Sequence, residues 1–317
     1  MIDIANLKVS TKLPLGGYPV GLVLSPSHDR VYVSDYSSDV VWVIDTRSLK
    51  VLATVTVVPS PGNMALTPDG SFLYVLSLSS GAISVVDTET NAAVQTITVP
   101  TQLLLSIAIT PDGRFAYATD CCSDNNVTVI DTHTNSVTTQ IPLAGGPSGI
   151  AITPNGRFAF VEDSADVSVI DVRENAVAAT IPGIGGCGPV VALNPDASLA
   201  YVENYCGNSI AVVDTHTWTT VTSWTTNTPI GMAFTAGGAF GFVLNNNCPA
   251  FPCTVPGTVS VTDTANDTVA ATVTVGSNPQ AIAIAPEVRH PPAEPAAYDG
   301  VGQHATPRAS SLCPVCR

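Results

Sequence analysis

The chain has 317 residues, of which 45% are hydrophobic and 11% are charged, and its formal net charge is −14 at pH 7. No apolar run approaches the roughly 20 residues that cross a bilayer, so no membrane span is expected. The acidic balance argues against nucleic acid as a partner, because a phosphate backbone would be repelled. Low charge with much Val, Thr, Ala and Gly is typical of strands buried on both faces.

An internal repeat organises the chain. A phrase close to V-x-V-[IV]-D-T recurs every 40 to 49 residues. Its aspartates are Asp45, Asp87, Asp131, Asp171, Asp214 and Asp263, and Asp3 in "MIDIAN" extends the series. A period near 40–45 residues with four strands per unit predicts the blade of a β-propeller. Sustained helical periodicity is absent, which argues against folds that place helices between strands.

The fourth unit shows how each blade is expected to run. Strand A is predicted at 147–153, the turn "PNG" at 154–156, strand B at 157–163, strand C at 166–171 and strand D at 176–182. Proline fixes φ in such a turn and glycine accepts positive φ. The β-branched residues between the turns favour pleated strands.

The repeated phrases also carry a family resemblance. "RVYVSD", "FLYVLS", "RFAYATD", "RFAFVED" and "LAYVEN", each followed by a phrase like "VIDT", resemble the YVTN-repeat β-propellers, which include the YncE-like and surface-layer-type proteins. The resemblance covers residues 1–287 and implies an exported protein, in a family whose functions vary. Related lactonase-type propellers are enzymes, so the fold alone does not decide the activity.

The expected fold is an all-β propeller of the seven-bladed type, with six complete four-stranded blades and an incomplete seventh shared by the N- and C-termini. "MIDIANLKVSTKLPLGG" would supply the end of strand C and strand D, and "PQAIAIAPE" (279–287) would supply strand A. We predict one propeller domain over 1–287 and a Pro/Ala-rich, disordered tail over 288–317. Both ends are expected to be non-native, an internal start accounting for the lack of a visible signal peptide.

Polar residues concentrate on one predicted face. Loops between strands B and C and between blades share this face, which we call the top face. The candidate ligand-binding residues on it are Asp35, Tyr36, Asp120, Glu162, Asp163, Glu203, Asn204, Tyr205 and Asn245. Two interpretations stay open for the acids and amides: turn capping by their side chains, or an oxygen-rich site for Ca²⁺ or another divalent cation. No histidine falls in a top loop; His133 and His216 fall in C–D turns on the opposite face.

Six of the eight cysteines fall in the predicted top loops: Cys121, Cys122, Cys187, Cys206, Cys248 and Cys253. Cys187 with Cys206, and Cys248 with Cys253, are plausible disulfides, while Cys121 and Cys122 could pair with each other or elsewhere. A thiolate metal site is the rival interpretation. "CPVCR" at 313–317 has the spacing of half a zinc site or of a redox pair. Disulfides indicate an extracytoplasmic location, although no signal peptide is visible.

The predicted function is a binding or scaffolding module whose protein, glycan or small-molecule partner contacts the acidic, cysteine-rich top face. A monomer without a required cofactor is expected. The alternative is a lactonase-like hydrolase or lyase with a metal or paired carboxylates at the channel mouth, where Asp120, Glu162, Asp163 and Glu203 are the candidates. A third possibility is a structural module of a cell-envelope layer.

Overall fold

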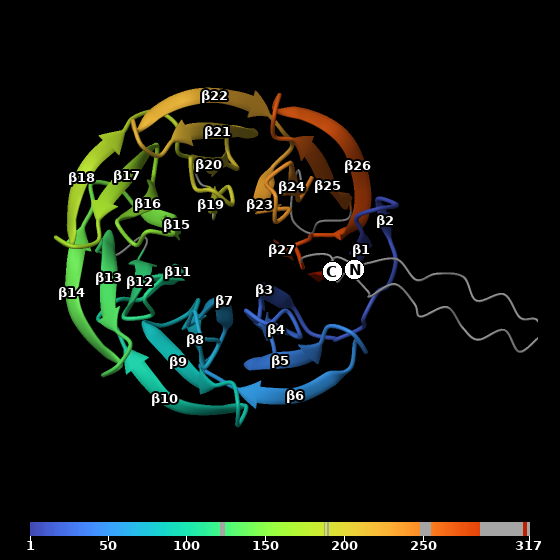
Figure 1. The fold of residues 1–317 in the computed structure, drawn as a ribbon. Helices are drawn as coiled ribbons and strands as arrows, with labels where there is room; N and C mark the ends of the chain where they lie inside the picture. Colours follow the sequence, from blue (N-terminus) through green and yellow to red (C-terminus); the bar gives the residue numbers. More distant parts are fainter. Residues whose placement is uncertain (121–123, 187, 189, 248–254, 286–312, 316–317) are drawn as a thin grey trace, which may run out of the picture.

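Six four-stranded antiparallel sheets surround a central axis (Figure 1). The structure is a computed structural model, and it describes residues 1–120, 124–186, 188, 190–247, 255–285 and 313–315. In each sheet the strands follow chain order, from an inner strand A through B and C to an outer strand D. The all-β propeller with six complete blades is therefore confirmed.

The bounds of the blade strands follow the repeat closely. Blade 1 holds β3 (Pro19–Leu24), β4 (Arg30–Asp35), β5 (Val40–Asp45) and β6 (Val51–Thr56); blade 2 holds β7 (Pro61–Leu66), β8 (Phe72–Ser77), β9 (Ala82–Asp87) and β10 (Ala92–Thr98). Blade 3 holds β11 (Leu104–Ile109), β12 (Phe115–Asp120), β13 (Asn126–Asp131) and β14 (Ser136–Pro142); blade 4 holds β15 (Pro147–Ile152), β16 (Phe158–Asp163), β17 (Asp166–Asp171) and β18 (Ala176–Ile181). Blade 5 holds β19 (Val191–Leu193), β20 (Leu199–Asn204), β21 (Ser209–Asp214) and β22 (Thr219–Thr225); blade 6 holds β23 (Pro229–Phe234), β24 (Phe240–Asn245), β25 (Pro256–Asp263) and β26 (Thr268–Ser277).

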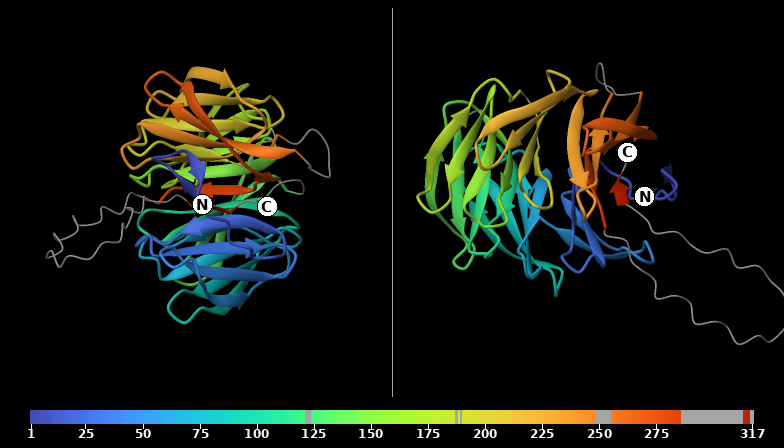
Figure 2. Two further views of the ribbon diagram at one scale, coloured as in Figure 1. Left: turned by 90° about the vertical axis from the view of Figure 1, so that its right-hand side faces the viewer. Right: turned by 45° about the horizontal axis from the view of Figure 1, so that its top comes forward.

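The predicted incomplete seventh blade is not supported, because the two chain ends do not share a sheet. β1 (Ile2–Asp3) pairs with β2 (Lys8–Val9), and β27 (Ala281–Ala283) pairs with β28 (Cys313–Val315). Each end thus finds its own hydrogen-bonding partner. β27 contacts the inner strands of blades 6 and 1, and all four short strands lie at this junction (Figure 2). β28 is a strand within a tail for which none was expected.

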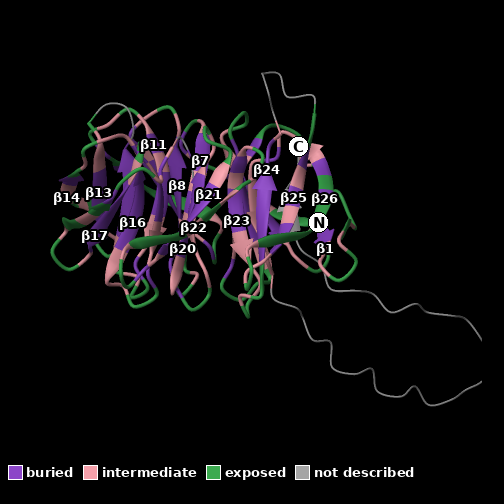
Figure 3. Cartoon of the chain, turned by 90° about the horizontal axis from the view of Figure 1, so that it is seen from above, coloured by how far each residue is buried: buried purple, intermediate pink, exposed green. Residues whose placement is uncertain are grey.

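The core lies between neighbouring blades. Strands B and C are almost fully buried, because both of their faces contact another blade, whereas outer strands such as β22 are largely exposed (Figure 3). Tyr74 and Ile83 of blade 2, for example, pack in one apolar cluster with Leu104 and Ala116 of blade 3. This burial on both faces accounts for the low charge of the sequence.

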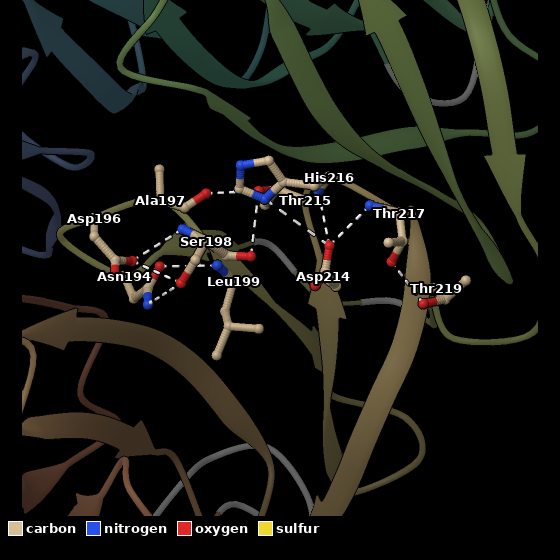
Figure 4. Close-up of polar contacts among 10 residues, drawn as sticks. All are labelled: Asn194, Asp196, Ala197, Ser198, Leu199, Asp214, Thr215, His216, Thr217 and Thr219. Carbon is tan, nitrogen blue, oxygen red and sulfur yellow. Dashed lines mark hydrogen bonds and ion pairs between the residues drawn. The ribbon is translucent and has the colours of Figure 1, made fainter.

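The repeated aspartate caps the turn between strands C and D. In blade 5, Oδ1 of Asp214 accepts hydrogen bonds from the backbone N–H groups of His216 and Thr217, both at 2.8 Å (Figure 4). Asp131 does the same for His133 and Thr134. Both histidines are exposed turn residues, as predicted.

A tyrosine on strand B joins some neighbouring blades. The hydroxyl of Tyr74 donates to Oδ1 of Asn135 in the next blade at 2.6 Å, and Tyr117 donates to Asn175 in the same way. Both asparagines occupy the left-handed region, which asparagine and aspartate tolerate better than most residues. Where blades 5 and 6 meet, the corresponding residue is Asp267, and neither the Tyr201 hydroxyl nor Oδ1 of Asp267 has a hydrogen-bond partner among the described residues.

We therefore expect Asp267→Asn to raise the free energy of unfolding by about 1 kcal/mol at pH 7. Burial raises the pKa of Asp267, so its charge is unfavourable there, and the amide reproduces the Tyr74–Asn135 pairing. Urea denaturation measures the gain, and the reciprocal Asn175→Asp should lower stability. Equal stability of Asp267→Asn and wild type would contradict this account.

Candidate functional site

Strands B all point the same way, so their last residues meet at the top face. Asp35, Asp120, Asp163 and Asn245 are buried there, and Asn204 is half-buried. The structure thus brings the predicted polar residues to one end of the propeller. Their side chains are mostly directed at nearby backbone and loop groups, as the following contacts show.

Asp35 and Asp163 tie two top loops of their own blades together. Oδ1 of Asp35 accepts from the backbone N–H groups of Tyr18 at 2.8 Å and Ser37 at 3.0 Å. Burial alone would raise the pKa of Asp35, but hydrogen bonds from Ser38, Tyr18 and Ser37 outweigh it and lower the pKa. In blade 4, Oδ1 of Asp163 accepts from Gly145 N–H at 2.7 Å.

The amides serve similar contacts. Asn245 accepts from the Thr226 hydroxyl at 2.7 Å and donates to the Ser260 hydroxyl at 2.9 Å. Asn204 donates to the Gly185 carbonyl at 3.2 Å. The capping interpretation therefore accounts for these contacts of the residues that end strands B.

Glu162 and Glu203 differ from these last residues of strands B, because each stands one residue before the end of its strand. Blades 1 and 3 have Ser34 and Thr119 at this position, whose hydroxyls donate at 2.7 Å to a carbonyl on the inner strand of the next blade. Blades 2 and 6 have Leu76 and Leu244 at the same position. Two carboxylates in adjacent blades therefore replace short or apolar side chains.

Both glutamates are completely buried. Oε1 of Glu162 accepts from the N–H groups of Gly186 and Gly188, each at 2.8 Å, on the segment that leads into blade 5. Oε2 of Glu162 and both carboxylate oxygens of Glu203 have no hydrogen-bond partner among the described residues. Buried polar atoms are nearly always paired, so three unpaired carboxylate oxygens in one region are exceptional.

The surroundings of the pair favour the protonated acids. Burial raises the pKa of Glu162 to about 7, although the Gly186 and Gly188 N–H groups and Ser148 oppose the rise. Burial raises the pKa of Glu203 well above its usual range, and the negative charge of Glu162 adds to this effect. The pair therefore changes its proton content near neutral pH.

Gly188 lies close to both glutamates, since its N–H donates to Glu162 and its Cα faces the backbone of Glu203. Its carbonyl accepts from the Ser148 hydroxyl at 2.7 Å. A Cβ at Gly188 would lie 1.8 Å from the backbone carbonyl oxygen of Glu203 and 2.9 Å from Oε2 of Glu162. Those two oxygens hence lie on the same side of Gly188, which only a glycine allows at this spacing.

An aromatic pair forms a second feature of the top face. Tyr36, a predicted site residue, contacts Tyr18 edge-to-face with 6.2 Å between ring centroids, and the two are 43% and 38% exposed. The Tyr18 hydroxyl accepts from the Asn278 amide at 2.7 Å. Sequence reasoning missed Tyr18 and Asn278, since they are 260 residues apart and meet only at the junction of blades 6 and 1. Tyr205 is half-buried elsewhere, in blade 5.

The cysteine predictions are mostly outside the described residues. Cys121, Cys122, Cys187, Cys248 and Cys253 all fall there. Cys206 is disulfide-bonded, but no described side chain is its partner, so the Cys187–Cys206 bridge stays a prediction. Among the described residues, no three His, Cys, Asp or Glu side chains form a group suited to a metal ion. The same part of the chain contains no helix that is long and apolar enough to cross a membrane.

Comparison with known proteins shows the fold alone. No family model matches the chain, and no curated protein matches it. Among solved structures, the chain is similar to Kuenenia stuttgartiensis hydrazine synthase, with a TM-score of 0.75 and 22% identity over 88% of this chain and 92% of that one. It is also similar to the β-propeller domain of Myceliophthora thermophila Cps50 (Swd1), with a TM-score of 0.74 and 10% identity over 87% and 92%. At these identities, what the chain shares with both proteins is the β-propeller.

Proposed function

We propose that the protein is an extracytoplasmic binding module of the YVTN-repeat type, whose top face contacts a protein partner. The observation that carries this proposal is the exposed Tyr18–Tyr36 pair. Tyrosine is enriched at interfaces because its ring offers apolar area and its hydroxyl a polar contact. The Cys206 disulfide supports an oxidising location.

The charge of the chain suggests which partner fits. The net charge is −14, and three aspartates near the ends of strands B are half-buried or exposed: Asp39 and Asp124 in the loops after strands B, and Asp166 at the start of β17. A partner with a basic surface would be attracted to such a face and associate faster at low salt. A basic protein is therefore the expected partner class.

Tyr36→Ala should weaken partner binding at least tenfold, the loss typical of truncating a central aromatic contact. The test captures partners from extract and medium of the source organism, then titrates each purified partner against wild type and variant. Val221→Ala is the control, since Val221 is an exposed apolar residue on the outer strand β22. Unchanged affinity of Tyr36→Ala for every partner would remove the proposal.

A lactonase-like hydrolase or lyase is the second candidate. It is favoured by the pKa of Glu162, which at about 7 suits a general acid or base at neutral pH. Turnover in a lactone screen that disappears in Glu162→Gln would support it. No turnover with wild type, with or without added divalent metal, would eliminate it.

A further inference from the structure

We propose that Glu162 and Glu203 together bind one divalent cation of the oxygen-preferring class, Ca²⁺, Mg²⁺ or Mn²⁺, between blades 4 and 5. The site is independent of the tyrosine pair and of any partner at the top face. Two completely buried side chains supply it, with three carboxylate oxygens that accept no hydrogen bond from the part of the chain that the structure describes.

The first argument is the cost of leaving these oxygens unpaired. A buried carboxylate without a counter-charge is strongly unfavourable, so it either takes up a proton or pairs with a cation. Among the described residues, no Lys or Arg bonds or pairs with Glu162 or Glu203. Within the described residues, the charged group that acts on Glu203 is Glu162. The groups that act on Glu162 are neutral: the Ser148 side chain and the N–H groups of Gly186 and Gly188. A divalent cation would neutralise both carboxylates at once.

The second argument is the way in which Glu162 is held. Two N–H groups, from Gly186 and Gly188, fix Oε1 as an acceptor at 2.8 Å each and leave Oε2 free. Oε2 lies beside Gly188, on the same side as the backbone carbonyl oxygen of Glu203. Carboxylate and carbonyl oxygens are the ligands that hard divalent cations prefer.

The third argument comes from the other blades. Ser34 and Thr119, at the same position, each satisfy a carbonyl of the next blade. In two adjacent blades a glutamate stands in place of the residue that makes this contact. The charges of the two glutamates repel each other unless a cation or a proton lies between them. Two side chains leave part of the coordination shell to water, as magnesium sites in proteins commonly do.

The test is calorimetric titration of chelator-stripped full-length protein with CaCl₂, MgCl₂ or MnCl₂ at pH 8, alongside the melting temperature. We expect one ion to bind with 1:1 stoichiometry and to raise the melting temperature, and Glu203→Gln to weaken binding at least tenfold. Asp124→Asn, which removes an exposed top-face acid, should bind like wild type. At pH 5 the affinity should fall, because protons compete for the same oxygens.

Two results would overturn the proposal. One is that none of the three ions binds wild type stoichiometrically below about 1 mM, which would mark the pair as a proton site only. The other is that Glu203→Gln binds as tightly as wild type, which would place the ion elsewhere. Should Glu203→Gln fail to fold, Glu162→Gln takes its place in the titration, and electron paramagnetic resonance of wild type with Mn²⁺ tests whether one ion binds.

Discussion

Glu203→Gln is expected to be more stable than wild type at pH 8 and about equally stable at pH 4. The pKa of Glu203 is raised well above its usual range by burial and by the charge of Glu162. An acid with a raised folded-state pKa stabilises the fold below its unfolded pKa, and this contribution is lost as the pH rises toward the folded pKa. Glutamine does not ionise, so the variant escapes that loss.

The expected gain at pH 8 is about 3 kcal/mol in the free energy of unfolding. This is the penalty typical of a buried charged group that lacks its partner. Glu162, whose pKa is about 7, carries a cost of the same order above neutral pH, because each pKa unit corresponds to about 1.4 kcal/mol. Glu162→Gln should in turn lower the pKa of Glu203, since it removes the charge that raises it.

Urea denaturation from pH 4 to pH 9, with EDTA present to remove divalent ions, measures the effect. Glu174→Gln is the matched control, because Glu174 is an exposed turn residue and should keep the wild-type pH profile. Parallel profiles for Glu203→Gln and wild type would mean that Glu203 is not desolvated as the structure indicates.

The six blades could be predicted because local chemistry repeats with them. Strand A of blade 4 was expected at 147–153 and is Pro147–Ile152. The aspartate that marks each repeat has a local task, since Asp131 and Asp214 cap turns formed by the next three residues. Hydrogen bonds over such short separations can be inferred from a single repeat unit.

The carboxylate pair was only partly predictable. Glu162 and Glu203 were recognised as top-face acids, but not as buried neighbours. Aligning "RFAFVED" and "LAYVEN" with "RVYVSD" would have shown two charges at a position that is otherwise hydroxyl or apolar. Their burial depends on how closely Gly188 approaches both glutamates. That contact joins two blades, so the sequence of a single repeat does not reveal it.

The chain ends were predicted wrongly for a related reason. A shared sheet was expected from matching strand phrases, yet β1 pairs with β2 and β27 with β28. Ile2 of β1 is buried in the apolar cluster of blade 6, with Phe242 and Val259. The strand phrases identify segments that suit a sheet, but the partner of each is decided by long-range packing.

Gly188→Ala is expected to lower the free energy of unfolding by about 3 kcal/mol, the upper part of the range for overpacking. The added Cβ would lie 1.8 Å from the backbone carbonyl oxygen of Glu203, and a backbone atom cannot move aside as the end of a side chain can. Either β20 or the segment into blade 5 must shift. β20 carries Glu203, and the segment into blade 5 carries the N–H groups that donate to Glu162, so the damage should reach the site.

Calorimetric melting of Gly188→Ala and of Gly237→Ala separates this steric effect from the general effect of a glycine substitution. Nothing lies within 4 Å of a Cβ at Gly237, so that control should melt like wild type or slightly higher, because alanine reduces the entropy of the unfolded chain. Gly188→Ala should melt well below both and show a weaker rise in stability toward acid pH. The reason is that the added Cβ should push Glu162 and Glu203 apart and so reduce the repulsion between their charges. A wild-type melting temperature for Gly188→Ala would instead show that β20 does not approach Gly188 closely.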